Sequence, residues 1–308
     1  KQKTAYEIMP SLVGSEMCIR DRYTGELIEY ELGAHALALG FAYTPLANDV
    51  TAFYWNPAGI AENKISGVSV SRIDRFSGLG KIISVGLSKY FTSTSTGLAI
   101  GVNYFGVDSI PQTEIDPEDS TNFIVKNYLN PKNFTLYLVY SRRLSMLSFG
   151  VGTKLIYFDY ILEKAYGIGA DFGLLYSYAD MVDFGLKVSN SLGTMLVWTT
   201  GRKVYIPPVL QYGVCVRNEV AQSGEVIFVI QFDTNLEWKP SELEPLYTDS
   251  RIGLEYIYKN IFGIRVGKTP YGISFGAGIK YGALSADYGL MVGHELGSNL
   301  CVSIGLRL

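Results

Sequence analysis

From about residue 66 onwards, apolar residues alternate with small or polar residues along the chain. Between Tyr271 and Tyr281 every second residue is Tyr, Ile, Phe or Ala, and Gly, Ser or Lys stands between them. The segment Tyr166–Ser177 follows the same pattern. A period of two places one set of side chains on each face of a β-strand. Tyrosines bracket the apolar stretch at about ten residues, the length of a membrane-crossing strand with an aromatic girdle at each interface. The pattern therefore favours lipid-facing strands over a soluble β-sandwich.

The alternation recurs often enough to close a barrel. The further segments that fit it are 66–73, 81–90, 96–106, 132–142, 147–159, 181–190, 204–217, 225–237, 249–259, 261–268, 283–291 and 298–308. Together with the two segments above, these make about fourteen strands, an even number as single-chain bacterial barrels require. The predicted fold is an all-β, transmembrane antiparallel barrel over residues 66–308.

The connections between these segments alternate in length. One set is mostly tight, and the other includes 107–131, 191–203 and 238–248. Long loops on the outer side and short turns on the periplasmic side are expected of an outer-membrane barrel. We therefore predict a bacterial outer-membrane location with surrounding lipid as a partner. Segment 107–131 is acidic, a property of a solvated loop or of a surface that selects a basic partner.

Composition excludes several other classes. The chain has 308 residues, of which 48% are hydrophobic and 18% charged, against roughly 25% charged in soluble domains. The sequence has no run near the roughly 18 apolar residues of a transmembrane helix. A net charge of -3 argues against nucleic acid as a partner, because nucleic-acid binding calls for a basic patch.

Residues 1–22 resemble a translated sequencing adapter. Lys1–Glu7 matches the peptide that a flow-cell adapter encodes, and Leu12–Asp21 matches one from a transposase-end adapter. We exclude this segment from fold reasoning, and we expect the true start, with any signal peptide, to be lost. Without it the chain carries 22 basic residues (26 minus 4) and 26 acidic ones (29 minus 3).

The charged and strongly polar residues of the predicted strands share one face, the one opposite the apolar positions. A Lys or Arg facing lipid at the midplane would cost roughly 2–4 kcal/mol, so these side chains must point inward. They either pair across the lumen and hold the barrel together, or line a solute path. They are Lys154, Asp171, Asp183, Lys187, Gln231, Asp233, Glu255, Arg265, Lys280, Asp287 and Arg307.

Residues 23–65 precede the barrel and show no sustained strand alternation. Such a segment cannot cross lipid as an open strand, so it must lie inside the barrel or at its periplasmic mouth. Asn56-Pro57 predicts a rigid turn, and Gly59 permits close approach to the wall. The motif either anchors a plug or contacts a ligand, and the nearby aromatic residues Phe41, Tyr43, Phe53, Tyr54 and Trp55 could line a ligand pocket.

This segment resembles the N-terminal hatch of FadL-like outer-membrane proteins, specifically of the PorV/PorQ family. The matching residues are Gly33, Ala34, Ala36, Leu37, Asp49, Trp55, Asn56, Pro57, Ala58 and Gly59. His35 stands where an arginine is usual, and Gly40-Phe41 replaces a common Gly-Gly pair. The resemblance extends over residues 33–308 and implies an N-terminal hatch over 23–65.

Searching for chemistry yields no catalytic or metal-binding motif. His35 and His294 have no partners at metal-ligand spacing, and Cys215 and Cys301 are too few for a disulfide framework. No nucleophile elbow, P-loop or dinucleotide fingerprint occurs in its required context. We therefore expect a protein that is not an enzyme and that needs no cofactor.

Two functions follow from the resemblance and the barrel. The PorV/PorQ likeness implies an outer-membrane partner of a type IX secretion system, which binds C-terminal domains of secreted cargo or other secretion-machinery proteins through its long connections. The alternative is a FadL-like transporter, which passes hydrophobic small molecules by the hatch and sideways through the wall. That route requires an apolar pocket beside the plug and a break in a strand.

Overall fold

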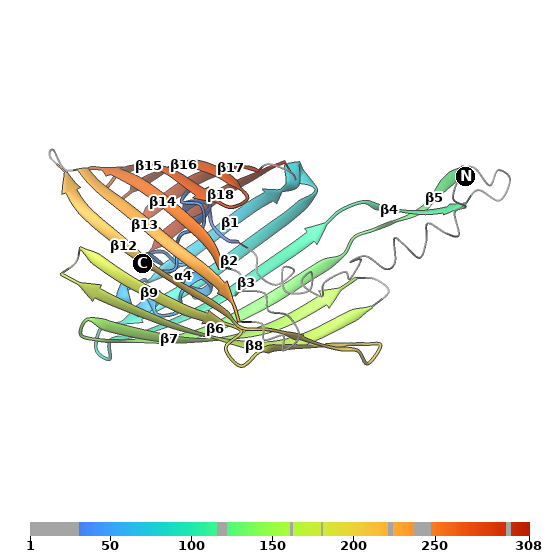
Figure 1. Ribbon diagram of the computed structural model, residues 1–308, viewed down its shortest axis with the longest axis horizontal. Helices are drawn as coiled ribbons and strands as arrows, with labels where there is room; N and C mark the ends of the chain where they lie inside the picture. The colour runs from blue at the N-terminus through green and yellow to red at the C-terminus, as the bar shows by residue number, and fades with distance from the viewer. Residues whose placement is uncertain are drawn as a thin grey trace, which may run out of the picture. The chain divides into compact units, whose positions relative to one another are not determined.

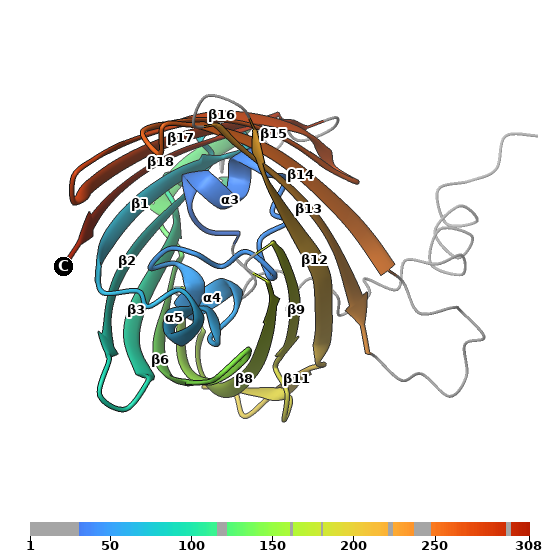
Figure 2. The same cartoon turned by 90° about the vertical axis from the view of Figure 1, so that its left-hand side faces the viewer.

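The computed structural model describes residues 31–115, 122–160, 163–179, 181–220, 224–236, 248–293 and 297–308. One large antiparallel sheet dominates this part of the chain and closes on itself (Figures 1 and 2). Residues 1–22, taken from the sequence as adapter-derived, lie outside the described residues, as do residues 23–30 and His294.

Within the described residues, fourteen strands form the barrel wall, and each pairs with the next around the ring. They are β1 (Gly67–Arg75), β2 (Gly80–Phe91), β3 (Thr96–Val107), β6 (Lys132–Leu144), β7 (Leu147–Asp159), β8 (Lys164–Tyr178), β9 (Val182–Ser189), β12 (Val209–Val220), β13 (Gly224–Asn235), β14 (Thr248–Tyr258), β15 (Phe262–Thr269), β16 (Gly272–Tyr281), β17 (Leu284–Gly293) and β18 (Ser298–Arg307). Pairing of β1 with β18 closes the ring. The predicted fold class is confirmed.

The wall is sorted as the alternation predicts. In β7 the burial pattern changes at every residue, with Val151 and Leu155 exposed and Lys154 buried between them. On the outside, neighbouring strands carry aromatic rings side by side: Tyr104 lies 5.1 Å from Phe134, and Tyr157 lies 5.3 Å from Tyr166, between ring centroids. This ladder is the aromatic girdle expected where a strand leaves the hydrocarbon.

Two connections differ from the prediction. Segment 107–131, predicted as a loop, contains a separate β-hairpin of β4 (Ile110–Ile115) and β5 (Phe123–Leu129), which extends beyond the barrel in Figure 1. Segment 191–203 contains β10 (Thr194–Trp198). The predicted strand 204–217 is two strands, β11 (Lys203–Ile206) and β12, because Pro207-Pro208 offers no N–H to continue the ladder. Most of 238–248 lies outside the described residues.

The N-terminal segment (residues 31–66) lies within the ring of strands, as Figure 2 shows. It forms three short helices, α3 (Ala34–Ala38), α4 (Ala52–Trp55) and α5 (Gly59–Glu62). Helix α3 packs on β15 to β18, whereas α4 and α5 pack on β2, β3, β6 and β7. A 3-10 turn, η1 (Phe76–Gly78), follows β1. No helix in the described ranges is long and apolar enough to cross a membrane. The action of the segment as a hatch stays a prediction.

Candidate functional site

The Trp-Asn-Pro-Ala-Gly motif (Trp55–Gly59) packs and hydrogen-bonds against the wall, which holds the N-terminal segment in place. Asn56 is fully buried, and its side-chain amide donates to the carbonyls of Thr44 and Leu174 at 3.1 Å each. Its own carbonyl oxygen accepts from the Ala58 N–H at 3.2 Å. Pro57 lies so close to β7 and β8 that a Cβ at Gly150 or Gly173 would collide with it. Gly59 likewise faces the backbone of Ala47 without room for a side chain.

The five aromatic residues predicted to line a ligand pocket pack into the core of this segment. Phe41 and Trp55 stack with centroids 5.9 Å apart, and Tyr43 and Tyr54 approach Trp55 edge-on. The Trp55 indole N–H donates to the Leu32 carbonyl at 2.9 Å. All five are buried, including Phe53. They contact one another and the wall, and the cavity described below is lined by other residues. Their role toward a ligand stays a prediction.

A chain of polar contacts links the segment to β14, β15 and β17. The Tyr43 hydroxyl lies 2.8 Å from Asp49 Oδ2, 2.7 Å from Asn48 Oδ1 and 3.2 Å from His35 Nδ1. His35 Nε2 lies 3.0 Å from the buried Glu255 carboxylate. Burial, with the adjacent Asp49 carboxylate, holds the pKa of Tyr43 well above its usual value, so the phenol remains a neutral donor.

The chain continues through Arg265. Its Nε lies 2.7 Å from Glu255 Oε1, and its Nη1 lies 2.6 Å from Asp287 Oδ1. Sequence spacing offers no reason to place His35 beside Glu255, which follows it by 220 positions. The contact arises because α3 packs against the inner face of the late strands.

A second cluster of predicted inward charges lies on β7, β8 and β9. Asp171 Oδ1 is 2.9 Å from Lys154 Nζ, and Asp171 Oδ2 is 4.0 Å from Lys187 Nζ. Lys187 also donates to the Tyr54 carbonyl at 2.6 Å, so it joins the wall to the N-terminal segment. All three side chains are nearly fully buried.

Of the remaining predicted residues, Asp183 pairs with Arg217, and Asp233 pairs with Arg251 at 3.0 Å. Gln231 accepts from the Tyr43 and Thr44 N–H groups.

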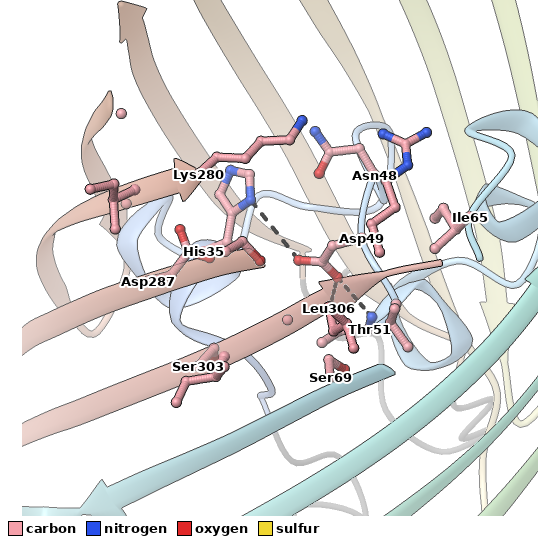
Figure 3. A pocket seen from close by; sticks show the side chains of 18 of the residues that line it. His35, Asn48, Asp49, Thr51, Ile65, Ser69, Lys280, Asp287, Ser303 and Leu306 are labelled. Atoms are coloured by element: carbon pink, nitrogen blue, oxygen red, sulfur yellow. Dashed lines mark hydrogen bonds and ion pairs between the residues drawn. The ribbon is translucent and has the colours of Figure 1, made fainter. Parts of the chain in front are cut away.

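A cavity of about 250 Å³ lies between the N-terminal segment and the inner faces of β14 to β18 and β1. Its lining includes Asn260 and Ala283, which belong to short turns, so it opens at the end where an outer-membrane barrel meets the periplasm. His35, Asp49, Lys280 and Asp287 face it in Figure 3. Lys280 and Arg307, both predicted to point inward, line this periplasmic cavity.

The regular strand pairing is interrupted beside β8, although the Ser191 N–H still donates to the Ala170 carbonyl at 2.7 Å. β9 pairs with β8 as far as Val188 opposite Phe172, and β10 resumes the ladder with Met195 opposite Ile168. Between these pairs β8 has three residues (169–171), whereas the partner strand has six (189–194), a surplus of three. This wall interruption (Asn190–Gly193) is a wide bulge in the ladder, and Leu192 within it is 84% exposed. The Asn190 N–H donates to Asp171 at 2.9 Å.

Apolar side chains gather on the inner face next to the interruption. We call Ile156, Phe158, Tyr160, Leu196 and Trp198 the outer apolar cluster. The ring centroid of Trp198 lies 6.4 Å from that of Phe158 and 5.7 Å from that of Tyr160. Leu196 covers Gly167 of β8, where a Cβ would collide with it. Sequence reasoning missed this cluster, although the alternation of Leu196 and Trp198 with Met195 and Val197 could have revealed the extra strand.

Nothing in the described ranges groups three or more His, Cys, Asp or Glu side chains as a metal site would. Cys215 and Cys301 are buried, free thiols.

Solved structures with the same fold are outer-membrane barrels. The toluene transporter TodX of P. putida aligns with 90% of this chain and 98% of its own length, at a TM-score of 0.57 and 14% identity. The toluene transporter TbuX of Ralstonia pickettii gives the same coverage at a TM-score of 0.56 and 12% identity. A Pseudomonas aeruginosa FadL homologue covers 89% of this chain at 0.54 and 10% identity, with 98% of its own length aligned. No protein-family model and no curated protein matches the sequence.

These comparisons define the class: the chain has the fold of FadL-like bacterial outer-membrane barrels, and the predicted location is confirmed. They also correct the functional reading. The interpretation as a type IX secretion partner is wrong, because the similar structures are hydrocarbon transporters and channels. The PorV/PorQ assignment, which rested on the N-terminal segment, is not supported by any family model.

Proposed function

We propose that this barrel, acting without catalysis, lets small hydrophobic molecules cross the outer membrane. A solute would bind the outer apolar cluster and leave the lumen sideways through the wall interruption. The observation that carries the proposal is the three-residue surplus between β8 and β9–β10, directly beside the cluster. Because the N-terminal segment packs against strands around most of the ring, a route along the barrel axis would have to displace it.

Two further features support a sideways route. Leu192 gives the interruption an exposed apolar side chain, which favours transfer of an apolar solute. Pro207-Pro208 separates β11 from β12. Because β9 pairs with β12 and β10 pairs with β11, the break between β9 and β10 lies beside the break between β11 and β12. The similar structures are described as toluene transporters, which fits solutes of this class.

Deletion of residues 191–193 tests the route. The deletion removes the surplus and would pair Asn190 with Ala170 and Thr194 with Gly169, in step with the flanking pairs. We expect uptake of radiolabelled toluene, by cells carrying the protein, to fall by roughly tenfold or more, a barrier increase of about 1.4 kcal/mol. Assembly of the barrel is checked by its resistance to detergent unfolding.

The companion variant is Leu192→Ser, which keeps the length of the bulge and removes only the exposed apolar side chain, so uptake should fall less than in the deletion. Unchanged toluene uptake in an assembled deletion variant would show that solute does not leave through the interruption.

A further inference from the structure

Two cations that line the periplasmic cavity have no ion-pair partner among the described residues. Most inward charges are paired: Lys154 with Asp171, Arg251 with Asp233, and Arg265 with Glu255 and Asp287. Lys280 and Arg307 make no ion pair within the described residues, although both line the cavity. Cations that face a shared cavity without a partner attract an anion.

The three acidic residues of the lining already accept hydrogen bonds, Glu255 from Arg265 at 2.7 Å. Asp287 accepts from Arg265 at 2.6 Å. Asp49 Oδ1 accepts from the N–H and hydroxyl of Thr51 at 2.7 and 2.5 Å, and its Oδ2 accepts from Tyr43. Because these carboxylates already have hydrogen-bond donors, Lys280 and Arg307 are the charged groups that an incoming ligand would contact.

Strand register places the two cations around one small space. Lys280 of β16 stands opposite Ser285 of β17, and Ser285 stands opposite Gly305 of β18, two positions before Arg307. Two strands separate by about 9.6 Å and two residues along a strand by about 6.7 Å, so long Lys and Arg side chains can converge. Between them the wall offers only the Ser285 hydroxyl and Gly305.

We propose that the periplasmic cavity binds a phosphate group between Lys280 and Arg307. An ammonium and a guanidinium supply eight N–H donors, with the fork of Arg suited to two phosphate oxygens. Ser285 adds a hydroxyl. This donor set exceeds what the two oxygens of a carboxylate can accept, whereas a phosphate offers three or four oxygens. The proposal does not depend on the hydrocarbon route, because it concerns the opposite end of the lumen.

The test is a calorimetric titration of the full barrel, in nonionic detergent at low ionic strength, with inorganic phosphate and separately with acetate. We expect phosphate to bind and acetate to bind more weakly. Lys280→Gln and Arg307→Gln should each weaken phosphate binding by about tenfold, as loss of one charge-assisted hydrogen bond predicts. Lys89→Gln, which removes an exposed cation outside the cavity, is the matched control and should bind as the unmodified protein does.

Three results would overturn the proposal: no phosphate binding, phosphate binding by both cavity variants as tight as that of the unmodified protein, or equal weakening by Lys89→Gln, which would indicate a general charge effect. Barrels in phosphatidylglycerol rather than phosphatidylcholine nanodiscs then distinguish the source. Weaker apparent phosphate binding there assigns the site to a lipid headgroup, and unchanged binding assigns it to a soluble phosphate. Toluene uptake by Lys280→Gln should be normal, so failure of this site leaves the proposed transport untouched.

Discussion

The inner wall of the barrel has two regions with the same pattern of inward glycines in the sequence. In one region the N-terminal segment packs against these glycines, and in the other it does not. On β2, β3, β7 and β8 the inward glycines receive the N-terminal segment: Phe53 covers Gly86 and Gly101, and Pro57 covers Gly150. On β15, β16 and β18 the glycines at positions 263, 278 and 305 meet only wall side chains, and the space above them is the periplasmic cavity. A small inward residue thus either makes room for the N-terminal segment or leaves an empty space. The effect of enlarging that residue on stability depends on which of the two it does.

The largest expected difference between the two regions concerns buried charge. Asp171→Ala leaves Lys154 buried without its carboxylate partner, which costs about 3–5 kcal/mol in the free energy of unfolding. Asp287→Ala removes a side chain that is 18% exposed, and Arg265 keeps Glu255, so the cost should be smaller, about 1–2 kcal/mol. Urea unfolding in detergent measures both. Equal losses would mean that the cavity side is as tightly packed as the plugged side.

Glycine substitutions sharpen the comparison at a smaller scale. A Cβ at Gly150 would collide with the backbone of Pro57 and Ala58, whereas a Cβ at Gly305 would meet only the Ser285 hydroxyl, which can rotate away. We expect Gly150→Ala to cost about 1–3 kcal/mol through overpacking and Gly305→Ala to stay within about 0.5 kcal/mol. The same unfolding measurement applies, and a large loss for Gly305→Ala would contradict the assignment of open space there.

The strands could be predicted from the sequence because lipid enforces a period of two at every crossing. Thirteen of the fourteen wall strands lie within a few residues of their predicted ends, whereas the predicted strand 204–217 is divided into β11 and β12. The wall interruption could not, because its three surplus residues shift the inward positions from odd to even numbers, as in Ser189 and Leu196. In so short a segment, this shift of the alternation is indistinguishable from a loop.

The cavity also escaped prediction, for a different reason. Glycine and serine mark the inward face equally well whether the N-terminal segment reaches them or not, as Gly150 and Gly305 illustrate. Pairs such as His35 with Glu255 depend on how the segment lies across the lumen, and local spacing carries no information about that. The inward position of Lys280 follows from alternation, whereas its lack of an ion-pair partner among the described residues does not.

Tyr43 lies at the boundary of the two regions and gives the smallest expected effect. Its ring packs against Trp55 on the plugged side, and its hydroxyl bonds Asp49 beside the cavity. Tyr43→Phe keeps the packing and removes the hydroxyl. The Asp49 side chain is 37% exposed, so water can replace the lost donor, and the cost should be about 1 kcal/mol.

The pH dependence of this loss is a second readout. Because burial raises the pKa of Tyr43 in the folded protein, the phenol is protonated in both folded and unfolded states below its unfolded pKa of about 10. The difference between Tyr43→Phe and the unmodified protein should therefore be constant from about pH 6 to 9. Above about pH 10 the unfolded phenol ionises first, so the unmodified protein loses more stability than the variant as pH rises. Convergence of the two unfolding curves already near neutral pH would contradict a buried, neutral Tyr43 and would place its hydroxyl in the open cavity.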